Sequence, residues 1–210
     1  MSNDIQKADQ IAHRFYTKLT LVVNNARATA EPRSGAKVDK WASLLVQFNL
    51  ETPDSDMFRE HLRTYRAISG SPSPPPFELQ VLLSVPELTN NQVLVYLAPD
   101  SSRLRIDPTP RHILLENWLL NFTPGSPPTR FGEDQGDVAP STIYKHGIPL
   151  FRSLYSLLRI LPSWKLFKKL RRRTAGAYRN GNLSIQLRVK GMDDGIGDIL
   201  EFGKPRCMQP

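Results

Sequence analysis

The sequence predicts a single α+β domain. Strand-like runs cluster in the middle of the chain, and helical patterns stand before and after them instead of alternating with them. A doubly wound parallel sheet needs a helix between successive strands, so this order argues against that fold. The chain has 210 residues, which is long enough to bury a full core without a disulfide or a structural metal.

The first element is predicted to be a long amphipathic helix. Its apolar residues recur at alternating steps of three and four: Ile5, Ala8, Ala12, Phe15, Leu19, Val22 and Ala26. The charged residues lie elsewhere on the helix: Lys7, Asp9, Arg14 and Lys18. Pro32 and Gly35 indicate its end.

The middle of the chain is predicted to form the sheet. The apolar run from Trp41 to Leu50 is strand-like, and Pro53 to Tyr65 has the pattern of a short helix capped by Asp54 or Ser55. Three longer β-prone runs follow: Phe77 to Val85, Gln92 to Ala98 and Ile113 to Phe122.

A short strand is predicted between the last two of these runs. Leu104 and Ile106 alternate there with Arg103 and Arg105, which places the arginines on an exposed face. Two proline- and glycine-rich segments, residues 69–76 and 123–140, are predicted to be mobile loops within one domain that spans residues 1–210.

The second half of the chain adds two helices and a strand. Ile148 to Leu161 is apolar over most of its circumference, which predicts a buried helix with Arg152 on a narrow polar face. Pro162 should break that helix, and Ser163 should cap another from Trp164 to about Arg173. Leu183 to Val189 alternates as a strand does, and Ile199 to Phe202 is a short last strand at most.

Charge is distributed unevenly along the chain. The formal net charge is +8, yet no Asp or Glu occurs from Val138 to Met192. That span holds twelve basic residues: Lys145, Arg152, Arg159, Lys165, Lys168, Lys169, Arg171, Arg172, Arg173, Arg179, Arg188 and Lys190. The positive potential is therefore local, and it favours an acidic partner.

The cluster Lys168, Lys169, Arg171, Arg172 and Arg173 has three interpretations. It is a solvated helix C-terminus, a contact for an anionic protein or membrane, or a nucleic-acid site. Specific nucleic-acid binding is disfavoured because no finger, aromatic strand or recognition helix accompanies the charge.

No catalytic, metal or cofactor motif is present, so the sequence predicts neither an enzyme nor a cofactor. The four histidines lack metal-ligand spacing, and Cys207 is the single cysteine, which suggests a reduced, cytoplasmic compartment. The chain has no apparent secretory signal and no apolar run long enough to span a bilayer, although peripheral membrane contact stays open.

One stretch resembles a known family. Ile143-Tyr144-Lys145 leads into Leu150 to Arg159 and then Leu161 to Leu166, followed by the basic cluster and the strand Leu183 to Val189. This order is similar to the N-terminal HORMA domain of autophagy-related protein 13, particularly its fungal form. The opening helix with Phe15 to Lys18, the pair Lys40-Trp41 and the run Ile113 to Trp118 support the resemblance.

The resemblance implies a HORMA fold, with a central antiparallel sheet backed by three long helices. It also implies a non-catalytic docking domain in the regulatory subunit of the autophagy-initiating kinase complex, located at the autophagosome assembly site. The implied partners are the autophagy-specific phosphatidylinositol 3-kinase complex, the multispanning vesicle protein of the pathway and, in many organisms, autophagy-related protein 101, a second HORMA protein. The kinase and scaffold would bind a tail that this sequence lacks.

The family also implies a phosphate sensor made of two basic residues. By position these are Arg152 and an arginine of the Arg103-Leu104-Arg105 strand. A buried Arg152 must be paired, so a structural salt bridge or carbonyl contact is the alternative to a phosphate pocket. A basic anion- or nucleic-acid-binding domain of another kind remains the competing function.

Overall fold

The computed structural model describes residues 3–29, 44–53, 55–70, 74–123, 139–174, 183–191 and 199–202. Its elements in chain order are α1 (Asn3–Arg27), β1 (Leu44–Gln47), β2 (Leu50–Pro53), the 3-10 helices η1 (Asp56–Phe58) and η2 (Arg63–Gly70), β3 (Phe77–Ser84), β4 (Val95–Leu97), β5 (Arg103–Arg105), β6 (His112–Leu120), α2 (Pro140–Ile160), α3 (Pro162–Thr174), β7 (Ser184–Val189) and β8 (Ile199–Leu200). The predicted pair Lys40-Trp41 and most of the predicted loop 123–140 lie outside these ranges.

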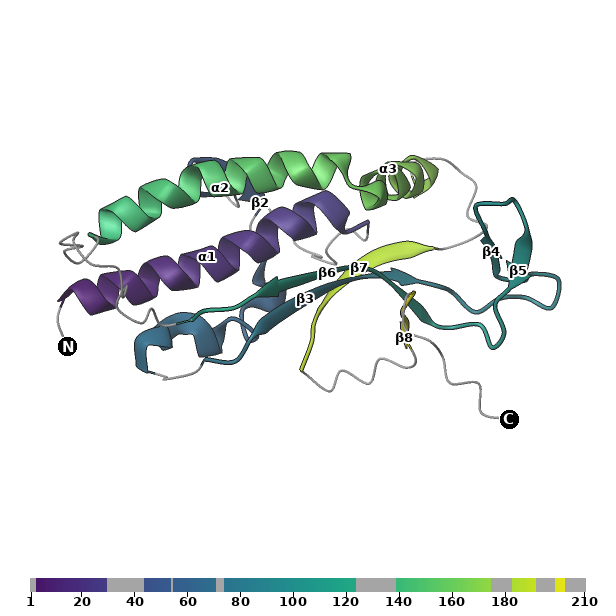
Figure 1. Ribbon diagram of the computed structural model, residues 1–210, viewed down its shortest axis with the longest axis horizontal. Helices are drawn as coiled ribbons and strands as arrows, with labels where there is room; N and C mark the ends of the chain where they lie inside the picture. Colours follow the sequence, from purple (N-terminus) through teal and green to yellow (C-terminus); the bar gives the residue numbers. More distant parts are fainter. Residues whose placement is uncertain are drawn as a thin grey trace, which may run out of the picture.

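The domain has a helical layer over one face of a sheet (Figure 1). The helices α1 and α2 lie side by side, and α3 follows at the end of α2. The sheet has the strand order β7-β3-β6-β8. The central strand β3 pairs antiparallel with β6 and β7, whereas β8 joins β6 in parallel over two residues. The α+β prediction is confirmed, with β8 making the sheet mixed.

The core lies between the sheet and the helices. Phe77, Leu79 and Val81 of β3 are fully buried because they face the helical layer from the central strand. Tyr16 of α1 stacks on Tyr65 of η2 with ring centroids 4.2 Å apart, and both rings meet Phe77 edge-on. The predicted β-prone run from Phe77 to Val85 is therefore the central strand of the core.

The helix α1 is covered on more than one side, which sequence periodicity did not predict. Asp9 and Lys18, placed off the apolar face, are both buried. The two carboxylate oxygens of Asp9 accept hydrogen bonds from the backbone and hydroxyl of Ser69, at 2.9 and 2.7 Å. The Lys18 ammonium donates to the Leu50 carbonyl and, at 3.0 Å, to the Thr52 hydroxyl. These contacts attach η2 and β2 to α1.

A buried ion pair fastens the end of α1 to the sheet. Arg27 is fully buried, and its Nε and Nη2 donate to the Glu116 carboxylate of β6 at 2.9–3.1 Å. The Trp118 indole donates to the same carboxylate at 3.0 Å. This fork geometry satisfies both charges, which a buried pair requires.

The hairpin β1–β2 docks through its turn. Phe48 and Asn49 both have φ of +51°, the left-handed conformation that a two-residue hairpin turn needs. The fully buried Phe48 ring stacks on Tyr144 at 4.5 Å, and the Phe48 amide donates to the Tyr144 hydroxyl at 2.8 Å. Gly147 of α2 lies against the Phe48 ring, because a Cβ at this position would come within 2.6 Å of that ring. The predicted single strand from Trp41 is therefore the start of a hairpin.

Both late helices begin earlier than predicted. The helix α2 starts at Pro140, eight residues before Ile148, because proline suits the first helical position and the interior Pro149 is tolerated. Pro162 begins α3 in the same way, so Ser163 is its second residue rather than its cap. In contrast, Ser55 caps η1 as predicted, since its hydroxyl accepts from the Met57 amide.

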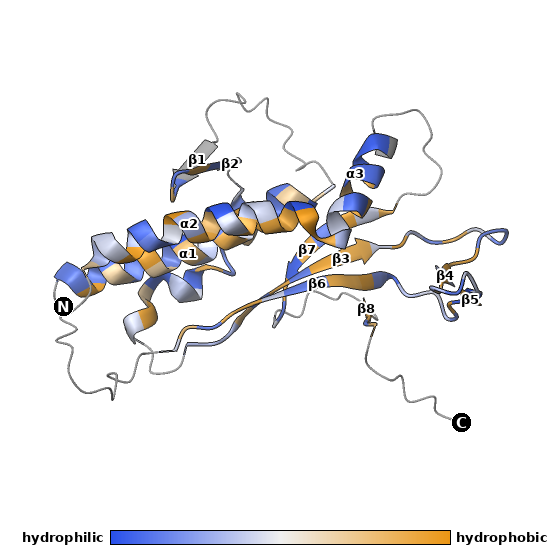
Figure 2. Cartoon of the chain, turned by 45° about the horizontal axis from the view of Figure 1, so that its top comes forward, coloured by the Kyte–Doolittle hydropathy of each residue, from blue (hydrophilic) through white to orange (hydrophobic). Residues whose placement is uncertain are grey.

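The prediction that α2 is a buried helix with only a narrow polar face is wrong. Only Gly147, Phe151 and Leu158 are buried, and Arg152 is exposed. The helix is covered by α1 and by the β1–β2 hairpin on one side, and its other side faces outward (Figures 1 and 2). Arg152 therefore needs no buried counter-charge.

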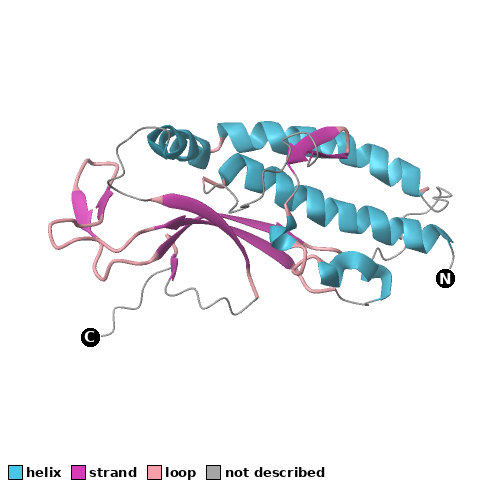
Figure 3. Cartoon of the chain, turned by 180° about the vertical axis from the view of Figure 1, so that it is seen from behind, coloured by secondary structure: helices cyan, strands magenta, loops and turns pink. Residues whose placement is uncertain are grey.

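A second hairpin extends from the far end of the sheet. The strands β4 and β5 pair with each other and not with the main sheet. All six of their residues are exposed, so the predicted exposed arginines are confirmed, but Leu104 is also exposed. Figure 3 shows this hairpin at the end of the molecule opposite the N-terminus.

Candidate functional site

The outer side of α2 carries a stripe of exposed apolar residues, which we call the α2 stripe. It consists of Ile143, Leu150, Leu157 and Ile160, with exposed fractions of 38%, 54%, 41% and 76%. The first three recur every seven residues, which keeps them along one side of a helix. Exposed apolar residues in such a row are typical of a helix that packs against a partner.

The inner side of α2 fixes the orientation of the stripe. Phe151 packs against Phe15 and Phe48, with ring centroids 5.1 and 4.8 Å apart. Leu158, one heptad later, is fully buried. Since the inward side is set by these residues and by Gly147, the stripe cannot rotate into the core without loss of the aromatic cluster.

The helix that carries the stripe is basic. The helix α2 contains no Asp or Glu, and Lys145 and Arg152 are exposed on it. At its end, Arg159 lies 3.3 Å over the Tyr155 ring and 5.4 Å from the Trp164 ring, which braces the corner between α2 and α3. A complementary partner would present apolar side chains with acidic residues around them.

The sequence contained the signal for this stripe, and our prediction missed it. The heptad spacing of Ile143, Leu150 and Leu157 is visible without a structure. Because the helix was expected to start at Ile148 and to be buried, Ile143 was left out and the other residues were assigned to the core.

The structure divides the predicted basic cluster. Lys168, Lys169 and Arg172 are exposed on α3, together with Lys165, which the prediction did not include. Arg171 turns toward the Phe167 ring at 5.8 Å. Arg173 belongs to the helix, but its side chain lies outside the described part.

The arginines of the predicted phosphate sensor do not converge in the structure. Arg103 and Arg105 lie on the terminal hairpin, where Arg105 pairs with Asp107 at 3.4 Å. Arg152 lies on α2, and α3 stands between that helix and the hairpin in Figures 1 and 3. They are two separate exposed positions.

A different basic group lies at the end of the sheet. Burial lowers the pKa of His112, and the nearby Arg111 and Arg188 lower it further. Arg111 and His112 also line a cavity of about 560 Å³ with Ser84 and Thr109. This group could not be predicted from sequence, because Arg188 comes from a strand 76 residues after His112 and the two strands are joined only through β3.

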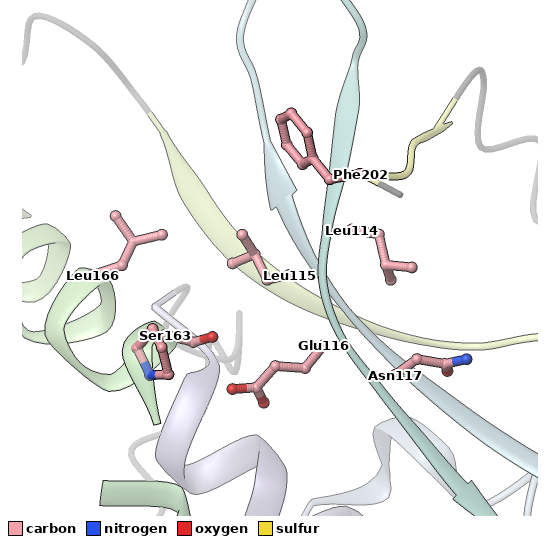
Figure 4. A pocket seen from close by; sticks show the side chains of 8 residues that line it. Leu114, Leu115, Glu116, Asn117, Ser163, Leu166 and Phe202 are labelled. Atoms are coloured by element: carbon pink, nitrogen blue, oxygen red, sulfur yellow. The ribbon is translucent and has the colours of Figure 1, made fainter. Parts of the chain in front are cut away.

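A cavity of about 450 Å³ lies between β6 and the start of α3 (Figure 4). It is lined by Leu114, Leu115, Glu116, Asn117, Pro162, Ser163, Leu166 and Phe202. Its carboxylate, Glu116, is already held by Arg27 and Trp118. The cavity is thus mainly apolar and adjoins the structural ion pair.

Neither a metal cluster nor a membrane-spanning helix is found in the described ranges. No group of three or more His, Cys, Asp or Glu residues there could hold a metal ion. No helix there is long and apolar enough to cross a bilayer.

Comparison with solved structures gives the fold. The chain superposes on an Atg13 HORMA domain with a TM-score of 0.55, over 93% of this chain and 72% of that one. The two sequences are 18% identical, so this similarity concerns the fold: a HORMA domain.

Curated relatives of similar sequence are fungal. Autophagy-related protein 13 of Penicillium rubens is 30% identical over 95% of this chain and 23% of its own length. The protein of that name from Sclerotinia sclerotiorum is 33% identical over 79% of this chain and 19% of its own. Autophagy protein 13 of Schizosaccharomyces pombe is 29% identical over 78% of this chain and 21% of its own length. The chain thus spans roughly a fifth of the length of these relatives.

The family model named autophagy-related protein 13 matches residues 12–200, which covers most of the helical layer, the sheet and the α2 stripe. The match and the HORMA fold agree with the resemblance seen in the sequence. The chain therefore belongs to the autophagy-related protein 13 family.

Proposed function

We propose that this chain is a non-catalytic docking domain of the regulatory subunit of the autophagy-initiating kinase complex, and that the α2 stripe is its surface for a second HORMA protein. The α2 stripe is the single observation that carries the proposal. Its four apolar side chains stand on a rigid helix whose other side is fixed by the Phe15, Phe48 and Phe151 cluster. Burying such side chains in an interface contributes about 25 cal/mol per Å² of apolar area.

Further parts of the proposal rest on family membership. They are recruitment of the autophagy-specific phosphatidylinositol 3-kinase complex and the multispanning vesicle protein, and residence at the cytoplasmic site of autophagosome assembly. Contact with the kinase and the scaffold is assigned to a tail beyond the HORMA domain.

The test is binding of the purified domain to autophagy-related protein 101 from the same organism. The variant L150E/L157E/I160E should lose at least tenfold in affinity by calorimetry, because each change puts a charge into the apolar contact. The matched control V93E/L97E/L104E alters three equally exposed apolar residues on and beside the β4–β5 hairpin and should bind like wild type. Loss of binding in the control but not in the stripe variant would contradict the proposal.

Anion sensing is a second candidate function, and the Arg111, His112 and Arg188 group favours it. The Arg111 guanidinium and the His112 imidazole line a cavity with two hydroxyl side chains, Ser84 and Thr109, and the charge of Arg188 adds to the positive potential there. Such a lining is suited to phosphate. Inorganic phosphate should raise the melting temperature of wild type and have a smaller effect on R111Q. If R103Q/R105Q or R152Q abolishes the response while R111Q keeps it, the sensor lies at the positions that the family resemblance indicated.

A further inference from the structure

The outward face of α3 concentrates positive charge. Lys165, Lys168, Lys169 and Arg172 follow a spacing of three, four and seven residues, which places them on one side of the helix. All four are exposed, and together they line a cavity of about 340 Å³. Figure 2 shows the helix as mostly hydrophilic on its outer surface. We call these four residues the α3 face.

No acidic residue of the described chain neutralises the α3 face. The ion pairs that the structure shows involve Lys7, Arg27, Arg59, Arg63, Arg105 and Lys190. Lys168 leans toward the Trp164 ring at 5.7 Å, a contact that leaves its charge in place. Four like charges within two turns repel one another, so the arrangement costs stability unless an anion binds.

The helix dipole accounts for only part of this pattern. Cations are favoured in the last turn of a helix, which fits Arg172. Lys165 lies in the first turn of α3, where the positive end of the dipole opposes a cation. Lys168 and Lys169 are in the middle, where the dipole has little effect. Three of the four cations are thus unfavourable or neutral for the helix itself.

Side-chain chemistry indicates the kind of anion. Three of the four residues are lysines, which act as point charges and lack the planar fork that arginine offers to phosphate. The large apolar side chains of α3 turn toward the core: Phe167 and Leu170 are buried, and Trp164 and Leu166 are half-buried against the same cluster. The helix therefore presents no fully exposed large apolar side chain for insertion into a bilayer. Lys165 and Arg172 are seven residues apart, about 10 Å along the helix. That length suits alternate carboxylates of an extended segment of about four or five residues.

We propose that the α3 face binds an acidic, extended peptide segment of a partner protein through its carboxylates. The site is separate from the α2 stripe, because it lies on a different helix and uses charge instead of apolar contact. Either proposal can therefore fail without the other.

The experiment measures binding of a fluorescein-labelled eight-residue peptide of alternating glutamate and serine by fluorescence anisotropy at several salt concentrations. Wild type should bind the peptide more weakly as salt rises and should bind a glutamine version at least tenfold more weakly. The variant K165Q/K169Q/R172Q should lose at least tenfold in affinity for the acidic peptide. K165R/K169R keeps the charge and should bind within threefold of wild type.

The matched control is R14Q/R63Q/R66Q, which removes the same charge from exposed arginines of α1 and η2. It should bind the peptide like wild type, and circular dichroism should show all variants folded. Equal loss in both triple variants, or no loss in the α3 variant, would overturn the proposal. So would absent peptide binding together with α3-dependent binding to phosphatidylserine vesicles, which would assign the face to a membrane.

Discussion

Two cations of α1, Lys18 and Arg27, are fully buried, and they are stabilised differently. Arg27 has a carboxylate partner in a fork geometry. Lys18 donates to a carbonyl and a hydroxyl group. Burial consequently lowers the pKa of the Lys18 ammonium to about 8. These residues determine how firmly β2 and β6 are attached to α1.

Lys18 should make stability depend on pH in a defined window. Between about pH 8 and pH 10.5 the unfolded chain keeps a proton that the folded chain has released, so the unfolding free energy rises with pH. Below pH 8 both states are protonated, and the penalty for burying the charge is present in full. Urea unfolding should therefore show wild type gaining stability relative to K18M between pH 7.5 and pH 9.5. If the difference in unfolding free energy between wild type and K18M stayed constant with pH, it would contradict a lowered pKa of Lys18.

The Arg27–Glu116 pair should show strong coupling. R27M leaves a mostly buried carboxylate without its counter-charge and should lower the unfolding free energy by about 3–5 kcal/mol at pH 7. The double variant R27M/E116Q removes both charges and should be more stable than R27M alone. Urea denaturation of wild type, R27M, E116Q and R27M/E116Q measures the coupling free energy between the two residues. Additive effects of the two changes would mean that the residues do not interact.

At the scale of elements, α2 packs one side into the core and exposes the other. Its inner side depends on Gly147, where a Cβ would come within 2.6 Å of Phe48 and 3.0 Å of Phe15. Its outer side forms the α2 stripe. Any change that lifts α2 from the Phe48 cluster would therefore also displace the proposed docking surface.

G147A tests this dependence. Alanine is usually the better helix residue, but here its methyl group would force the Phe48 ring out of place, and we expect a loss of about 1–3 kcal/mol. G70A is the matched control, since no atom lies within 4 Å of its added Cβ, and it should change the unfolding free energy by less than about 0.5 kcal/mol. Chemical denaturation measures the unfolding free energies of both variants. A G147A protein as stable as wild type would show that the Phe48 ring can move aside without cost.

The elements that sequence predicted well depend on local patterns. The apolar, β-prone run from Phe77 located β3 to within a residue, and alternation located β7 equally well. The first eight residues of α2 were not predicted to be helical, since Gly147 and Pro149 are residue types that usually interrupt helices. The β1–β2 turn was missed because Phe48 and Asn49 occupy it instead of the usual glycine.

At the scale of the whole molecule, contacts between residues far apart in sequence could not be predicted, because they depend on how the elements pair. Arg27 and Glu116 are 89 residues apart, and no local pattern joins them. The same holds for Arg188 and His112, which are 76 residues apart and influence each other electrostatically only when the sheet forms. The family resemblance supplied the fold, yet its two expected sensor positions stand apart on α2 and the β4–β5 hairpin.

The acid-free stretch of the sequence is also divided by the fold. Arg152 lies on α2, four cations form the α3 face, and Arg188 belongs to the sheet. The molecule therefore has an exposed apolar stripe and separate basic surfaces, which the two proposals assign to different partners.

Hydroxyl-radical footprinting of the domain, alone and with autophagy-related protein 101, tests the docking proposal most directly. Leu150, Leu157 and Ile160 should be protected from oxidation in the complex, because the partner covers the α2 stripe. Met57 and Leu97 are similarly exposed elsewhere and should keep their reactivity. Protection of Met57 or Leu97 with an unchanged α2 stripe would contradict the proposal that α2 is the docking surface.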